Sequence, residues 1–311
     1  MERALGTGLP LALEQDLVWY TDPESGESRS IVSHGKPFTG EEPSIEEYFF
    51  ETVRPLVERA LKETDRSDWP LITLNLDIKD NVIEHTAVVW ETLKKYDAWI
   101  TSAIKMDDIT KVQELDVKPM LVLSKGNGSE FEAFYERIPT GDKLLVFGVA
   151  RTSGGGTAPP EEIFRLPSDN FRRWWNSAWS VVETGGQRRA GDWTAAEAAR
   201  LKALVDRAHQ RGYWVRLYTL NGVGRRVDMG WSTGYDFGSG EAVALRWRAA
   251  SEAGVDFIAS DQYEDLSGLL KSSQQKDQRR KVNGYPEKSS TLGGYLVDFG
   301  IHGGMWRRRR G

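Results

Sequence analysis

Two pairs of polar side chains, each spaced by two residues, stand out in the first quarter of the chain. Glu14 and Asp16 close one apolar run, and Asp77 and Lys79 repeat the spacing in the run that begins at Leu71. In an extended strand, residues two apart share one face, so the members of each pair point the same way. Adjacent carboxylates repel each other unless a cation lies between them, and carboxylate oxygens suit Mg²⁺ or Ca²⁺. We therefore predict that Glu14, Asp16 and Asp77 hold one divalent cation.

A histidine follows the first pair. His34 ends the short extended run 30–34 and precedes a glycine, so it occupies a strand-to-loop position beside the predicted cation. An imidazole there suits a general acid or base near neutral pH. The alternative is structural: the acids are solvated strand ends, Asp77 pairs with Lys79, and His34 is an ordinary surface residue. The other histidines fall on helices or in the tail, and we assign them no chemical role: His85, His209 and His302.

The elements that must position these residues alternate between short apolar runs and helical patterns, which is typical of a parallel sheet with covering helices. We predict strands at residues 11–20, 30–34, 71–80, 120–124, 144–150, 177–183, 214–221 and 257–261. Two capping boxes, Ser44 with Glu47 and Thr194 with Glu197, predict helices over residues 45–62 and 195–211.

The distribution of polar residues favours one arrangement of these elements. Asn75, Asp77 and Lys79 gather at the late end of their strand, which is where α/β barrels place their active sites. We therefore predict an α/β fold of the TIM (β/α)8 type, with strand 1 missing at the N-terminus. A doubly wound open sheet is the alternative. Residues 1–270 are predicted to form the barrel, and residues 271–311 a C-terminal appendage with a basic tail.

Composition narrows the class of protein. The chain has 311 residues, 39% of them hydrophobic and 28% charged, as in ordinary soluble proteins. Its net charge of −5 argues against nucleic-acid binding, which needs a positive field. There is no cysteine, so disulfides and thiolate chemistry are excluded. The sequence has no run of about 18 apolar residues and no secretory signal, so we expect a soluble chain and leave its compartment open.

In this order and spacing, the motifs resemble a known family. Glu14-x-Asp16, then His34-Gly, then Asn-Leu-Asp-Ile-Lys79 is similar to the PLC-like phosphodiesterase superfamily, which includes the glycerophosphodiester phosphodiesterases and the phosphatidylinositol-specific phospholipases C. The segments 214–221 (WVRLYTLN) and 254–261 (GVDFIASD) resemble that family's seventh and eighth strands. Asp77 stands where Glu is commoner, as in the related spider-venom phospholipase D barrels. The resemblance extends over residues 14–265.

The resemblance implies a metal-dependent phosphoric diester hydrolase that acts on a glycerophosphodiester or a phospholipid headgroup. His34 would transfer protons and Lys79 would bind the phosphate. Substrate contacts are expected from polar and aromatic residues near the strand ends: Asn75, Tyr218, Asn221, Trp231 and Asp261. Trp231, in a glycine-rich loop, is also the candidate for peripheral membrane contact. No protein partner is predicted.

The sequence departs from the family in one respect. The family's first strand carries a further catalytic histidine, and here only residues 1–13 precede Glu14. We expect either an N-terminally truncated chain or one that has lost half of its acid/base pair. The second case leaves open a non-catalytic phosphate- or lipid-headgroup-binding barrel. A glycoside hydrolase is a further alternative, since the chain is rich in tryptophan and such enzymes use two carboxylates without a metal.

Overall fold

The computed structural model describes the chain except residues 155, 185–190, 223–235, 283–295 and 302–311. Its centre is a curled sheet of nine strands in the order β11-β10-β9-β8-β7-β5-β3-β1-β2, in which β11 also pairs with β1. The pairings are parallel except that of β2 with β1. The strands are β1 Leu11–Thr21, β2 Ser28–Val32, β3 Ile72–Ile78, β5 Met120–Ser124, β7 Phe147–Val149, β8 Arg172–Ala178, β9 Trp214–Tyr218, β10 Phe257–Ala259 and β11 Leu296–Ile301. Two short strands, β4 Ala103–Ile104 and β6 Lys143–Leu144, form a separate antiparallel pair.

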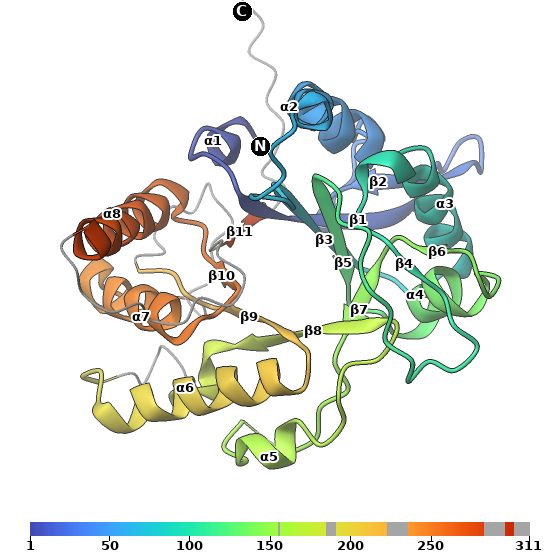
Figure 1. Cartoon of the computed structure of the whole chain (residues 1–311). Coiled ribbons are helices and arrows are strands. Elements are labelled where there is room, and N and C mark those ends of the chain that lie inside the picture. Colours follow the sequence, from blue (N-terminus) through green and yellow to red (C-terminus); the bar gives the residue numbers. More distant parts are fainter. Residues whose placement is uncertain (155, 185–190, 223–235, 283–295, 302–311) are drawn as a thin grey trace, which may run out of the picture.

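The helices between these strands differ greatly in length. Figure 1 shows α6, α7 and α8 beside β8–β10, whereas α2 and α3 lie beside β1 and β3. The helices are α1 Glu2–Leu5, α2 Glu51–Lys62, α3 Ile83–Lys94, α4 Gly128–Phe131, α5 Pro160–Ile163, α6 Ala195–Gln210, α7 Gly240–Ala253 and α8 Tyr263–Val282. None of the described helices combines the length and apolar character needed to cross a bilayer.

The prediction of a TIM (β/α)8-type barrel that lacks strand 1 is wrong. The structure is a mixed α/β fold with a curled, mostly parallel sheet, in which the connecting helices are very unequal and some are only one turn long. The stretch between β5 and β8, of which all residues but 155 are described, is an example. Its only α-helices among the described residues are α4 and α5, each of four residues. Strand 1 of the barrel was predicted to be missing, but β1 has a parallel neighbour on the side away from β3, namely β11. This strand comes from the segment 271–311 that was predicted as an appendage because Ser, Gln, Lys and Gly residues predominate at its start, although the strand itself is mostly apolar (LVDFGI).

Several local predictions are confirmed. Thr194 and Glu197 form the predicted capping box at the start of α6. Ser44 and Glu47 make the corresponding hydrogen bonds, but the turn that follows, Glu46–Phe50, is π-helical before α2 begins.

The strand predicted at residues 177–183 is wrong. The strand lies earlier, at β8, and Trp179–Val181 form a 3₁₀ turn. The arginines at the start of β8 disguised it, because they read as exposed although Arg172 packs its guanidinium over Phe131.

The opposite faces of β1 and β3 have different surroundings, and this sets the register. Leu11, Leu13 and Leu17 on β1 and Ile72, Leu74, Leu76 and Ile78 on β3 belong to the main hydrophobic core. Ala12 on the other face of β1 belongs to a second, smaller cluster that includes Leu121, Phe147 and Trp174. A slip of one residue would exchange the two faces and bury the acidic residues in the core. The apolar faces therefore fix which polar residues meet.

Candidate functional site

A cavity of about 220 Å³ lies at the late ends of the parallel strands. The lining residues come from β1, β3, β8, β9 and β10 and from the loops after β2, β3, β5, β9 and β10: Glu14, His34, Asn75, Leu76, Asp77, Lys79, Lys125, Trp174, Asn176, Arg216, Tyr218, Thr219, Asn221, Ala259, Ser260 and Asp261. Most of the residues singled out in the sequence are among them. Asp16 is not a lining residue, although it belongs to the acidic cluster described next. Trp231 lies outside the described residues.

The three predicted acidic ligands come together. In the β1–β3 register, Asp16 stands opposite Asp77 and Glu14 stands opposite Asn75. One carboxylate oxygen from each of Glu14, Asp16 and Asp77 lies within 4.8 Å of the other two. Oxygens on opposite sides of a bound ion are about 4.2 Å apart for Mg²⁺ and about 4.6–5.2 Å apart for Ca²⁺. The donor set is therefore of the right chemistry and spread for a hard cation such as Mg²⁺ or Ca²⁺.

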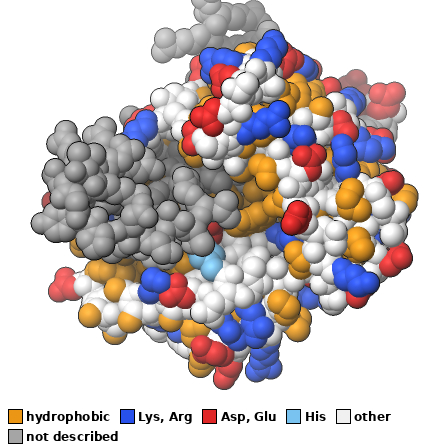
Figure 2. Space-filling view, viewed as in Figure 1, with side chains coloured by type: hydrophobic (Ala, Val, Ile, Leu, Met, Phe, Trp, Pro, Cys, Tyr) orange, Lys and Arg blue, Asp and Glu red, His pale blue; other side chains and the backbone are white. Residues whose placement is uncertain are grey.

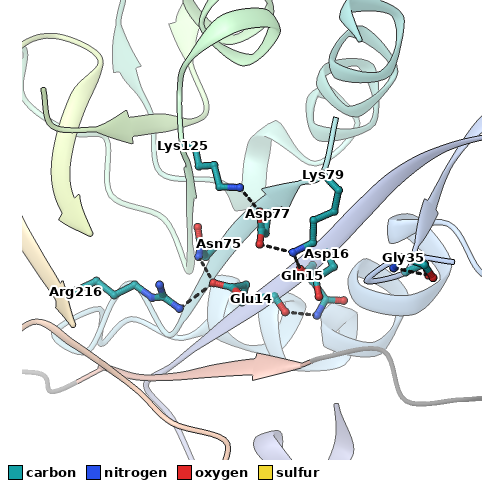
Figure 3. Close-up of polar contacts among 10 residues, drawn as sticks. Glu14, Gln15, Asp16, Gly35, Asn75, Asp77, Lys79, Lys125 and Arg216 are labelled. Carbon is teal, nitrogen blue, oxygen red and sulfur yellow. Dashed lines mark hydrogen bonds and ion pairs between the residues drawn. The ribbon is translucent and has the colours of Figure 1, made fainter. Parts of the chain in front are cut away.

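Two lysines contact the acidic cluster (Figure 3). The Lys79 ammonium lies 2.6 Å from Asp16 Oδ1 and 2.5 Å from Asp77 Oδ2, and the Lys125 ammonium lies 2.5 Å from Asp77 Oδ1. Burial opposes the charged form of both Asp77 and Lys79, but the hydrogen bonds between them and their partners outweigh it. As a result the pKa of Asp77 lies below its usual value and the pKa of Lys79 lies above it. Asp77 and Lys79 are therefore both charged at neutral pH.

Glu14 is held from the other side. Asn75 Nδ2 donates to Glu14 Oε2 at 2.7 Å, and Arg216 Nη2 donates to the same oxygen at 2.8 Å (Figure 3). Arg216 is itself oriented by Asn176, whose Oδ1 accepts from Nη1 at 2.8 Å. The guanidinium carbon lies 5.5 Å from the centre of the Tyr218 ring, within cation–π range. Glu14 thus has one fixed oxygen.

His34 reaches the cavity from the loop after β2. The backbone N–H of Ser33 donates to the carbonyl oxygen of Asp16 at 3.1 Å, which ties this loop to the strand of the acidic cluster. Farther back, Ser30 Oγ lies 2.8 Å from His85 Nε2, and His85 Nδ1 lies 2.9 Å from Asp80 Oδ2. His85 is buried on α3, and burial lowers its pKa more than Asp80 raises it. This network fastens β2 to the end of β3, in keeping with the structural role expected for His85.

On the opposite wall of the cavity, neutral and acidic side chains form a hydrogen-bond network. Asn221 Nδ2 donates to Asp261 Oδ2 at 2.6 Å, and Asn221 Oδ1 accepts from Ser260 Oγ and from the N–H of Asp261. All three residues are buried. Tyr218 and Asp261, predicted as substrate contacts, therefore face the same space as Glu14 and Asp77.

The loop that carries Lys125 is closely packed. Gly126 has φ +63°, and a Cβ there would lie 2.7 Å from Gly148 Cα. Its N–H donates to Glu130 Oε2 at 2.7 Å. Glu130 is buried, and this raises its pKa to about 7, although the bond from Gly126 opposes the shift. The backbone position of Lys125 is thus fixed, while its side chain is half exposed.

Sequence reasoning did not select Lys125, Arg216 or Asn176. Arg216 precedes Tyr218 by two residues on β9, so the period that placed Tyr218 at the pocket also places Arg216 there. Lys125 is the first residue after β5, and the register that pairs Leu76 with Ser124 places it at the level of Asp77. The rule that selected Asp77, a polar side chain at the late end of a strand, could therefore also have selected Arg216 and Lys125.

On the face shown in Figure 2, acidic and basic side chains of the described residues are interspersed, without a broad area of one charge.

Comparison of the chain with protein-family models, with curated proteins and with solved structures found no match.

Proposed function

We propose that the protein is a metal-dependent phosphoric diester hydrolase of the PLC-like phosphodiesterase kind. One observation carries the proposal: three carboxylate oxygens lie within 4.8 Å of one another, in a cavity that also presents His34 and the ammonium of Lys79. Hard acidic ligands, a point positive charge and an imidazole are the groups that phosphodiester cleavage requires.

In this proposal Glu14, Asp16 and Asp77 hold one Mg²⁺ or Ca²⁺. Bound there, the cation would polarise the non-bridging oxygens of the phosphate and stabilise the charge that develops during cleavage. Lys79 adds a positive charge beside the same phosphate. His34 transfers a proton to or from the attacking or leaving oxygen. Tyr218, Asn221 and Asp261 on the opposite wall contact the part of the substrate beyond the phosphate.

Of the described histidines, His34 lines the cavity, whereas His85 and His209 are engaged by Asp80 and Asp256 elsewhere. That observation favours a second candidate, a phosphate- or headgroup-binding protein without turnover, because acid/base cleavage normally uses two proton-transfer groups. A glycoside hydrolase is less suitable. Its two carboxylates must stand about 5–9 Å apart across a sugar, and here the acids cluster around shared cations.

The test uses Asp77→Asn with Asp97→Asn as its control. Asp97 is a half-exposed acid that pairs with Lys143 away from the cavity, so its change removes one carboxylate without touching the cluster. Hydrolysis of glycerophosphodiesters, phosphatidylinositol-like lipids and lysophospholipids is measured with and without EDTA, and cation binding is measured by calorimetry.

We expect EDTA to abolish turnover and Asp77→Asn to lower it by more than the roughly 10- to 100-fold typical of residues that only support a metal ligand. Asp97→Asn should behave as the unaltered protein. Turnover that survives both EDTA and Asp77→Asn would refute the metal assignment. Cation binding without turnover on any phosphodiester would favour the non-catalytic candidate.

A further inference from the structure

The cavity already contains its own cations. Lys79, Lys125 and Arg216 each contact at least one of the three clustered carboxylates. With Asp261 on the opposite wall, four carboxylates and three cationic side chains surround the space, and they leave one net negative charge. A divalent cation that binds alone turns this into one net positive charge. The single negative charge of a phosphodiester then makes the site neutral, whereas the same anion entering without the cation meets a negative site.

Lys125 is the cationic group best placed to change partners. Within the described residues its ammonium has one partner, Asp77, and its side chain is about half exposed. Arg216, by contrast, is buried and shared between Glu14 and Asn176, and Lys79 is shared between two acids. The backbone of Lys125 is held by the packed turn at Gly126, so its side chain can move without the loop. A cation on Asp77 competes directly with this ammonium.

We infer that Lys125 couples the divalent cation to the phosphate: it occupies Asp77 when the cation is absent, and it turns to the phosphate when the cation is bound. This inference rests on the proposed function for the identity of the ligands. It makes cation and phosphate cooperative, because the cation cancels the net negative charge that an anion meets alone, and the phosphate draws away the ammonium that competes with the cation for Asp77. By linkage, the factor by which phosphate tightens cation binding equals the factor by which the cation tightens phosphate binding.

The test is a calorimetric cycle on the full chain with Mg²⁺ alone, inorganic phosphate alone, and each in the presence of the other. The variant is Lys125→Met, which keeps most of the stem and removes the charge. Lys143→Met is the control, because Lys143 is equally exposed and also pairs with one carboxylate, but lies outside the cavity. Far-ultraviolet circular dichroism verifies that both variants are folded.

We expect the unaltered protein to show coupling within the range of roughly 5- to 150-fold that is typical of linked sites. In Lys125→Met, Mg²⁺ alone should bind more tightly, phosphate should bind more weakly, and the coupling should fall towards one. The opposite signs are decisive, because a purely structural lysine would weaken both ligands together. Unchanged or weaker Mg²⁺ binding in Lys125→Met, or independent binding in the unaltered protein, overturns the inference.

The two proposals fail separately. Coupling without turnover on any phosphodiester would refute the hydrolase and leave the role of Lys125 intact. Turnover that requires the cation, in a protein whose Mg²⁺ and phosphate bind independently, would refute the role of Lys125 and leave the hydrolase intact. Absence of both Mg²⁺ and Ca²⁺ binding, with and without phosphate, would refute both.

Discussion

The buried carboxyl of Glu130 should make the protein less stable as the pH rises. Glu130 is 3% exposed and lies under the loop of Lys125, where it accepts the N–H of Gly126. Burial raises its pKa from 4.5 to about 7. Between these two values the folded chain binds a proton that the unfolded chain has lost. Since stability falls with pH wherever the folded state holds more protons, Glu130 opposes folding progressively from about pH 4.5 to pH 7 and above.

The magnitude follows from the shift. One pKa unit corresponds to 1.36 kcal/mol, so this shift corresponds to about 3 kcal/mol of lost stability once both states are ionised. Glu130→Gln retains an oxygen that can accept from Gly126 and does not titrate. The stability of Glu130→Gln relative to the unaltered protein should therefore increase by about 3 kcal/mol between pH 4.5 and pH 8.

Urea unfolding followed by tryptophan fluorescence, in EDTA and at several pH values, measures this difference. Glu132→Gln is the control, because Glu132 is only partly buried, lies two residues along the same segment, and pairs with Arg137. Its stability relative to the unaltered protein should vary little with pH. A Glu130→Gln difference that is equally flat would show that Glu130 is ionised in the folded protein at low pH and would refute the reasoning.

Two further predictions concern the packing around the sheet. Arg246→Met should lower the free energy of unfolding, measured with urea, by about 3–5 kcal/mol, because it leaves the buried carboxylate of Glu183 without its bidentate partner. The double variant Arg246→Met/Glu183→Gln should recover part of that loss. Gly126→Ala should lower the melting temperature more than Gly26→Ala. Both glycines have positive φ, but only at Gly126 would a Cβ overlap a neighbouring backbone, that of Gly148, which costs about 1–3 kcal/mol. Equal losses of melting temperature in the two variants would contradict this close approach.

The acidic cluster could be predicted from the sequence because it depends on local geometry. Glu14 and Asp16 share a face whatever the fold, and so do Asp77 and Lys79. Joining the pairs required that the two strands be neighbours and in register, and the register pairs Asp16 with Asp77. Consecutive strands of a parallel sheet are often adjacent, so that step had a physical basis.

The fold itself could not be predicted in the same way. Alternation of strands and helices indicates a parallel sheet, but it does not specify how long each connecting helix must be. The short α4 and α5 have no apolar period to detect, since each has only four residues. The pairing of β11 with β1 joins residues nearly 300 apart in the chain, and no local pattern reports a contact of that kind. The pairing of strands that are distant in the chain therefore determined the fold.

The in-register pair of Asp16 and Asp77 explains why the site needs cations in every state. Like charges directly opposite each other on neighbouring strands destabilise a sheet, and here the pair is partly buried, which increases the repulsion. Lys79 relieves that repulsion without any added ion, because it lies two residues beyond Asp77 on the same face and bridges both acids. The chain can therefore fold with the acids already assembled. A divalent cation would then bind to a cluster that the fold has prepared, in competition with lysines that remain nearby and free to meet an anion.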